Sequence, residues 1–164
     1  MDSPTIRPAT ADDLAAINEI YNHYVRRSTC TYQEEPTTAD ERRAWFDAHG
    51  ARHPVTVAVI DGAVVGWGAL SVFRSRAAYL YTVEDSVYVR QDMQRRGIGK
   101  ALLADLIARA QALGHHAVMA LIDGEQGPSI ALHERFGFER VGLLKEVGYK
   151  FSRRLDVVYM ERLV

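Results

Sequence analysis

The sequence has one cysteine, Cys30, among its 164 residues. A single cysteine excludes an internal disulfide framework and a metal site built from cysteines alone, and it fits a reducing compartment. No apolar run approaches the roughly 18 residues of a membrane-spanning helix, and the first residues lack the basic start and apolar stretch of a signal peptide. We therefore expect a cytoplasmic protein.

An excess of charge is also missing, since 20 Lys and Arg residues face 21 Asp and Glu residues for a formal net charge of -1. Proteins that hold nucleic acid or anionic membranes by bulk electrostatics usually carry a clear basic excess. The sequence predicts neither partner. Repeats and low-complexity linkers are absent and 48% of the residues are apolar, so we expect one domain over residues 1–164.

Hydrophobic periodicity and turn residues divide the chain into strands and helices. Helices are expected after the caps at Thr10 and Thr38, from Gly97 to Leu113, and over residues 130–136. Strands are expected at residues 5–7, 55–60, 63–73, 79–89, 116–122, 139–147 and 155–163, with a tight hairpin turn at Asp61-Gly62. This order predicts a mixed central sheet flanked by helices, in an α+β or α/β/α-like fold.

Positive charge gathers between two of these elements, at residues 90–100. Four cations stand there against the single anion Asp92, a local charge of 4 − 1 = +3; they are Arg90, Arg95, Arg96 and Lys100. Gly97 and Gly99 allow successive backbone N–H groups to point to one spot, and the following helix directs its positive dipole end there. We expect this segment to bind phosphate groups.

The spacing of the glycines excludes two common phosphate loops. A Walker A loop would need glycine at Gln94 and Ser or Thr at Ala101. A dinucleotide-binding fingerprint would need a third glycine at Leu102, and it would not follow an antiparallel meander.

The segment from Gln94 to Gly99 resembles the Q/R-x-x-G-x-G/A acetyl-CoA loop of the GNAT superfamily of N-acetyltransferases. As in that superfamily, an apolar strand precedes the loop, and a segment of the L-[YH]-x-x-x-G-F type follows one strand later, here residues 132–138. Residues 82–89, 129–133 and 147–150, with Asp156, are similar to the phosphinothricin and methionine sulfoximine acetyltransferase group. The resemblance covers residues 6–160.

The resemblance implies a GNAT fold whose sheet splays at residues 84–89, so that acetyl-CoA inserts beside that strand without a metal. It places the pyrophosphate on the N–H groups of Arg95 to Ala101. The implied acetyl-CoA-binding residues are Val87, Tyr88, Val89, Gln94, Arg95, Arg96, Gly97, Ile98, Gly99, Lys100, Gln126 and Ser129. Gln126 stands where family members usually have an asparagine that bonds the pantetheine arm.

Acetyl transfer to an amine needs a base, and no covalent intermediate is required. Glu84 is the candidate base, acting directly or through a water, because a carboxylate in a partly buried strand can accept a proton near neutrality. By resemblance, its position matches the proposed catalytic glutamate of the family; the alternative is a structural ion pair with an arginine. Asp85 points to the opposite strand face and is expected to be structural. Cys30 has no local histidine, which disfavours an acyl-enzyme.

His133 stands where many family members have a tyrosine thought to protonate the CoA thiolate. A histidine could serve as that acid or as a base. The alternative is a buried helix histidine whose ring bonds a backbone carbonyl.

For the acceptor, basic and aromatic residues lead into the strand of Glu84, and a guanidinium fork suits a carboxylate or phosphinate. The implied pocket residues are Arg74, Arg76, Tyr79, Tyr32 and Lys150; the alternative for the arginines is a solvated turn. Arg153 and Arg154 are expected to be surface charges, and His115-His116 lacks metal-ligand spacing.

We therefore expect N-acetylation of a small amino acid or analogue such as phosphinothricin or methionine sulfoximine. The alternatives are acetylation of protein N-termini or another amine, and a catalytically silent acyl-CoA-binding module. Family members often form homodimers.

Overall fold

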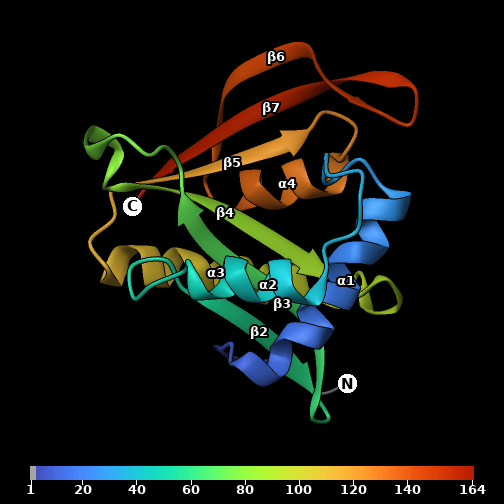
Figure 1. Ribbon diagram of the computed structural model, residues 1–164. Helices are drawn as coiled ribbons and strands as arrows, with labels where there is room; N and C mark the ends of the chain where they lie inside the picture. The colour runs from blue at the N-terminus through green and yellow to red at the C-terminus, as the bar shows by residue number, and fades with distance from the viewer. Residues whose placement is uncertain (1–2) are drawn as a thin grey trace.

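A seven-stranded mixed sheet, in the order β1-β2-β3-β4-β5-β7-β6, organises the computed structural model over residues 3–164 (Figure 1). The strands are β1 (Thr5–Pro8), β2 (Val55–Ile60), β3 (Ala63–Val72), β4 (Thr82–Val89), β5 (Ala117–Asp123), β6 (Glu139–Lys150) and β7 (Arg153–Leu163). The helices are α1 (Leu14–Arg27), α2 (Ala39–Asp47), α3 (Ile98–Ala112) and α4 (Gly127–Arg135). Met1 and Asp2, on which the signal-peptide prediction partly rests, lie outside the described residues.

The predicted element order is confirmed, with corrections at several ends. The strand expected from residue 79 begins only at Thr82, because Ala77–Tyr79 forms a 3-10 helix, η2. The strand expected to stop at residue 147 continues to Lys150. His116 lies just before β5, and α4 begins at Gly127, with Pro128 in its first turn.

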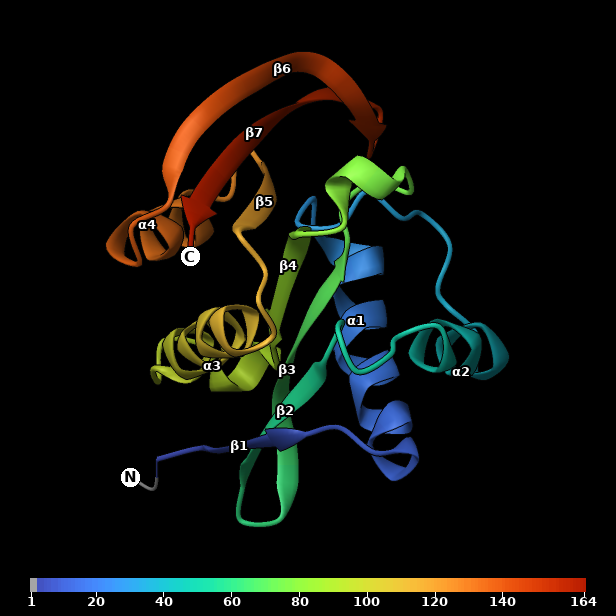
Figure 2. The same cartoon turned by 90° about the vertical axis from the view of Figure 1, so that its left-hand side faces the viewer.

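The central feature of the sheet is the parting of β4 from β5. These parallel strands pair over only three residues, and the last pair joins Glu84 to Met119. Both strands continue beyond that pair, β4 to Val89 and β5 to Asp123. The predicted splay is therefore confirmed, and it begins at Glu84. Figure 2 shows β4 and β5 diverging.

Helices cover both faces of the sheet (Figure 2). On one face α1 packs on β2 and β3 through residues such as Ile17, Val57 and Trp67. On the other face α3 packs on β3 and β4 through Leu106, Leu70 and Val83. Side chains alternate along a strand, so neighbouring residues of β4 face different helices.

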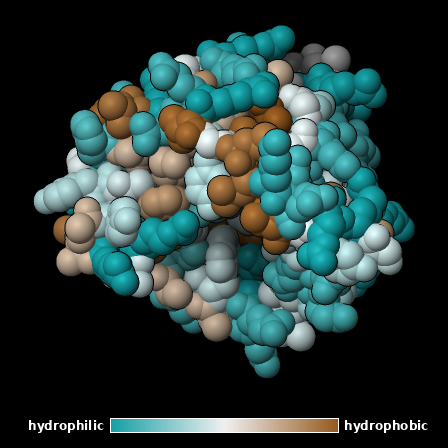
Figure 3. Space-filling view, turned by 90° about the horizontal axis from the view of Figure 1, so that it is seen from above, coloured by the Kyte–Doolittle hydropathy of each residue, from teal (hydrophilic) through white to brown (hydrophobic). Residues whose placement is uncertain are grey.

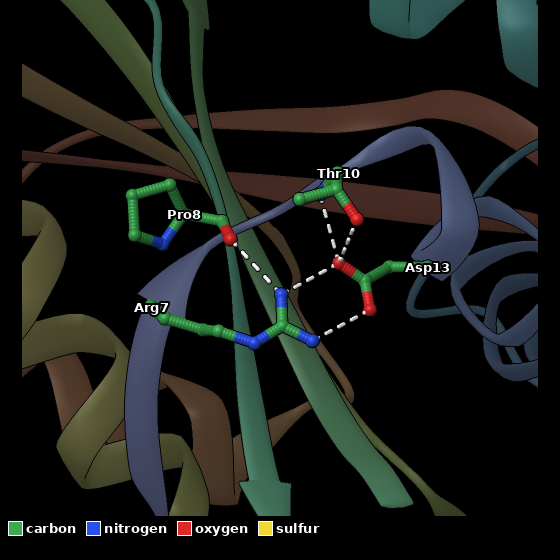
Figure 4. A network of polar contacts seen from close by, with 4 residues as sticks. All are labelled: Arg7, Pro8, Thr10 and Asp13. Carbon is green, nitrogen blue, oxygen red and sulfur yellow. Dashed lines mark hydrogen bonds and ion pairs between the residues drawn. The ribbon is translucent and has the colours of Figure 1, made fainter.

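A polar network fixes the start of α1 against β1 (Figure 4). The Arg7 guanidinium donates two hydrogen bonds, of 2.7 and 2.8 Å, to the Asp13 carboxylate. The same carboxylate accepts from the backbone N–H of Thr10 at 2.8 Å. These bonds hold the pKa of Asp13 below its ordinary value, the Arg7 hydrogen bond being the main cause.

Candidate active site

The predicted anion site lies at the start of α3 and stays a prediction. Gly97 precedes the helix with φ of 79°, in the left-handed region that suits glycine. Arg95 has φ of 59° and is one of few non-glycine residues there. The first helical bond runs from the Ala101 N–H to the Gly97 carbonyl. The Ala101 N–H is therefore engaged, which corrects the predicted set: only the amides before it can face a ligand.

The cations of this segment divide into a paired residue and three exposed ones. Arg90 donates to Asp92 at 2.7 Å, which cancels one positive charge. The exposed cations are Arg95, Arg96 and Lys100. The local charge of +3 therefore surrounds the amides at the start of α3, an arrangement suited to a pyrophosphate.

Tyr24 of α1 ties this loop to the open edge of β4. Its hydroxyl donates to the Val89 carbonyl at 2.5 Å and accepts from the Gln94 side chain at 2.7 Å. The sequence analysis assigned no role to Tyr24, so this anchoring contact was missed. The Gln94 side chain, which the motif predicts to be part of the acetyl-CoA loop, is thus held by a contact with α1.

Val87 and Val89 face α3, whereas Tyr88 packs on the α1 face. All three lie beyond the last pair with β5, on the part of β4 open to an inserted ligand. Ser129 is half-buried in the first turn of α4. Gln126 donates from its side chain to the Thr29 hydroxyl at 3.2 Å, so its amide joins α4 to the loop after α1.

Glu84 is half-buried at the point where the strands part. Burial raises the pKa of its carboxyl, the neighbouring charge of Asp85 raises it further, and Arg74 acts in the opposite direction. No ion pair to Glu84 is found among residues 3–164. A carboxylate without a partner and with a raised pKa suits a general base better than a structural ion pair.

Asp85 occupies the opposite strand face, as predicted, and pairs with His133 of α4. The His133 Nε2 lies 3.1 Å from a carboxylate oxygen of Asp85, and its Nδ1 lies 2.8 Å from the Ser129 carbonyl. His133 is only 4% exposed. Both ring nitrogens are engaged, so the geometry favours the structural alternative for His133, and its role as acid or base stays a prediction.

The structure does not bring the five predicted acceptor residues into one cluster. Arg74, Arg76 and Tyr79 are exposed between β3 and β4, at the left of Figure 1, whereas the β6–β7 turn after Lys150 lies at the right. Lys150 is 1% exposed, and its Nζ donates to the Ser28 and Thr31 carbonyls. The prediction that Lys150 lines the acceptor pocket is therefore corrected, because its ammonium group fixes the loop after α1 from inside the protein.

Tyr32 lies close to Lys150, against β6 and β7. Its hydroxyl donates to the Asp156 carbonyl at 3.0 Å. Burial, with the charges of Asp123 and Asp156, raises the pKa of Tyr32 to about 12. A Cβ at Gly148 would stand only 2.4 Å from the Tyr32 ring, so the ring rests directly on the β6 backbone.

A cavity of about 360 Å³ opens on the face of β4 that carries Glu84. Its walls come from α1, α2, β3, β4 and the loop before α2, and include Tyr21, Arg42, Trp45, Trp67 and Tyr88. Ser71, whose Cα is paired with that of Glu84, and Ser86 line the same cavity. Of these residues only Tyr88 was predicted to have a role, in binding acetyl-CoA. Arg42 and the other rings could not be assigned to a site from the sequence, because only packing brings α2 over this part of the sheet.

No group of three or more His, Cys, Asp or Glu side chains that could hold a metal ion occurs in residues 3–164. Over the same residues no helix is long and apolar enough to cross a membrane. The cytoplasmic location stays a prediction.

Two features thus adjoin the same parting of strands: an amide-lined basic turn and a half-buried carboxylate beside a cavity. Residues 17–138 match the Acetyltransferase (GNAT) family, and the chain belongs to that family. It is an N-acetyltransferase of the acetyl-CoA-dependent class, with the GNAT fold.

Among its relatives, an L-methionine sulfoximine/L-methionine sulfone acetyltransferase of Pseudomonas paraeruginosa is 41% identical, over 97% of this chain and 94% of that protein. A phosphinothricin N-acetyltransferase of Streptomyces coelicolor is 38% identical, over 96% and 94%. A GNAT superfamily phosphinothricin acetyltransferase from Sinorhizobium meliloti, solved in complex with acetyl-CoA, is 42% identical with a TM-score of 0.96, covering 99% of this chain and 89% of the other.

Proposed function

We propose that this chain transfers the acetyl group of acetyl-CoA to the α-amino group of a small L-amino acid or analogue of the methionine sulfoximine or phosphinothricin type. The observation that carries the proposal is the position of Glu84, half-buried where β4 leaves β5 and without an ion-pair partner among residues 3–164. The full-length similarity to enzymes named for those acceptors supports the substrate class.

In the proposed reaction the pyrophosphate of acetyl-CoA lies on the amides at the start of α3, and the pantetheine arm enters between β4 and β5. Glu84 accepts a proton from the acceptor's ammonium group, directly or through a water. The freed amine attacks the thioester carbonyl carbon, a C–N bond forms, and the C–S bond then breaks. The thiolate takes up a proton, which yields CoA and the N-acetylated acceptor.

The size of the cavity favours this acceptor over a protein N-terminus. A volume of about 360 Å³ suits a small molecule, whereas a peptide would need a long open groove. Arg74, Arg76, Tyr79 and Tyr32 do not line this cavity. We keep the proposal that the two arginines meet the acceptor's carboxylate and that the two tyrosines contact the acceptor, from positions outside the cavity.

The test is a thiol-release assay with acetyl-CoA and a panel of methionine sulfone, phosphinothricin and a short peptide with a free N-terminus. We expect turnover with the first two. Turnover with the peptide alone would favour the N-terminal alternative, and acetyl-CoA binding without any turnover would favour a silent module. The Glu84→Gln variant should bind acetyl-CoA normally but turn over slowly, whereas Gly97→Glu should lose acetyl-CoA binding.

We also propose that residues 1–164 are one domain, since a single sheet joins all seven strands.

We further propose that the protein forms a homodimer through β6. β6 is an edge strand and carries exposed apolar side chains, namely Val141, Leu143, Leu144, Val147 and Tyr149. Apolar residues also gather in the middle of the upper face, beside a hollow (Figure 3). Exposed apolar patches on an edge strand favour association. Light scattering after size exclusion should give twice the 18.4 kDa chain mass, and a monomer would contradict the proposal.

A further inference from the structure

The Arg42 side chain is a buried cation without an anionic partner. The residue is 4% exposed, and no carboxylate of residues 3–164 forms an ion pair with it. Its Nε donates to the Asn18 side chain at 3.2 Å. That bond is the only one its guanidinium makes within the described chain, although an arginine has five N–H donors.

Aromatic rings hold the guanidinium in place. Its carbon lies 4.7 Å from the Tyr21 ring centroid, 4.6 Å from that of Trp45 and 5.7 Å from that of Trp67. Cation–π contacts stabilise a guanidinium at such distances but leave its N–H donors unused. A buried charge is costly unless its hydrogen-bonding groups are satisfied, so the free donors mark a place for an acceptor atom.

Those donors belong to the lining of the cavity on the Glu84 face. Arg42 and all three rings line it, together with Ser71 and Ser86. Glu41 also lines it, but its carboxylate accepts hydrogen bonds from the Thr38 N–H and hydroxyl at 2.8 and 2.9 Å. These bonds engage the Glu41 carboxylate in capping α2, whereas the guanidinium of Arg42 keeps donors free beside the aromatic walls of the cavity.

The cavity extends from Ser71, beside Glu84, to Arg42. Ser71 is paired with Glu84 across β3 and β4. Ser86 lies two residues along β4 on the same face, a step of about 7 Å. An acceptor with its amine at Glu84 and a side chain of four or five bonds would reach about 6 Å into the cavity. The end of that side chain would then approach the wall formed by α2.

We propose that Arg42 is a specificity-determining residue that binds the oxygen-bearing end of the acceptor's side chain, such as a sulfone, sulfoximine, phosphinate or carboxylate. This inference rests on the proposed function and assigns its substrate selectivity to one residue. The planar guanidinium suits two oxygens on one tetrahedral atom, and the rings accommodate the apolar stem.

The experiment compares two acceptors that differ only in two oxygen atoms, methionine sulfone and methionine. In the Arg42→Met variant we expect kcat/KM for methionine sulfone to fall about 10- to 100-fold, as for loss of a hydrogen bond to a charged group, mainly through KM. The value for methionine should change less than about threefold, because Met can pack against the same rings. Arg42→Lys keeps the charge but loses the planar fork, so its kcat/KM for methionine sulfone should lie between the values of the wild type and of Arg42→Met.

Arg43→Met is the matched control. Arg43 is the next residue of α2, but it is exposed and pairs with Asp47 at 2.9 Å. This variant should leave both acceptors unchanged. An equal loss for the two acceptors in Arg42→Met, or no loss, would overturn the inference and leave Arg42 a packing residue.

The wild-type protein supplies a second test that requires no variant to fold. It should prefer methionine sulfone over methionine by at least about tenfold, and equal kcat/KM values would overturn the inference while leaving the proposed function intact. If the wild type binds acetyl-CoA but acetylates no amino acid, the proposed function fails, and the inference fails with it.

Discussion

Asp85 and His133 form a buried pair, 3.1 Å apart between Oδ2 and Nε2, on the sheet face opposite to Glu84. The two residues are 7% and 4% exposed. Because the His133 Nδ1 also lies against a carbonyl, both nitrogens are placed as donors, which is the arrangement of an imidazolium. Burial alone lowers the pKa of His133, but the hydrogen bond and charge of Asp85 outweigh burial, and the pKa is raised.

This pair predicts a pH-dependent contribution to stability. A raised pKa in the folded state stabilises the protein below the ordinary histidine value of about 6.5, and the stabilisation is lost as the pH rises through the folded value. In Asp85→Asn the free energy of unfolding at pH 6 should fall by about 3 kcal/mol, and its decline between pH 6 and 8.5 should flatten. Urea unfolding at several pH values measures both. An unchanged pH slope in the variant would contradict the assignment.

Replacing Glu84 is expected to lower the activity and to raise the stability of the protein. Its pKa is raised in the folded protein, so its contribution to stability is present below its ordinary pKa and is lost as the carboxyl ionises. Glu84→Gln should therefore melt at a higher temperature than the wild type at pH 7. Its kcat should fall about 10²- to 10⁴-fold, the usual contribution of a general base.

Thermal melts and single-turnover rates test this prediction together. The acidic limb of the wild-type kcat profile should have its midpoint above 4.5, the ordinary pKa of the carboxyl, and should disappear in the variant. A variant with full kcat at all pH values would exclude Glu84 as the base.

Gly97 should be required for acetyl-CoA binding through its backbone. In Gly97→Ala a β-carbon must adopt φ of 79°, which costs about 1 kcal/mol and reorients the amides at the start of α3. The dissociation constant of acetyl-CoA, measured by calorimetry, should rise about tenfold.

Gly114 provides the control for Gly97, because it has φ of 73° at the other end of α3. Gly114→Ala should lose similar stability with unchanged acetyl-CoA affinity. Equal affinities in the two variants would place the pyrophosphate elsewhere.

Gly148 should position Tyr32 for the acceptor. A Cβ there would stand 2.4 Å from the Tyr32 ring, so Gly148→Ala must displace the ring or the strand. The acceptor's KM should rise severalfold while the dissociation constant of acetyl-CoA stays constant. Gly142→Ala, also in β6, meets its nearest atom at an ordinary 3.7 Å and should behave as the wild type. A changed acetyl-CoA affinity in Gly148→Ala would indicate wider damage to the fold.

Local sequence signals predicted most of the fold because each has a local physical cause. Thr38 caps α2 by accepting the Glu41 N–H, and Asp61 and Gly62 adopt the positive φ values of a tight turn. The start of β4 was less predictable, because the apolar and aromatic residues before Thr82 fit a strand but lie in and just after the exposed η2 turn.

The sequence by itself determined where the glycines, the cations and the helix start of the predicted anion site lie, since they are within a few consecutive residues. Strand alternation likewise placed Glu84 and Asp85 on opposite faces. Only the tertiary structure decided which side chains meet. The Lys150 ammonium donates to a carbonyl more than a hundred positions away, and the His133 ring pairs with Asp85. Arg42 keeps free N–H donors beside a cavity. Such contacts depend on how α2, α4 and β6 pack on the sheet, and packing between distant segments leaves no spacing pattern in the chain.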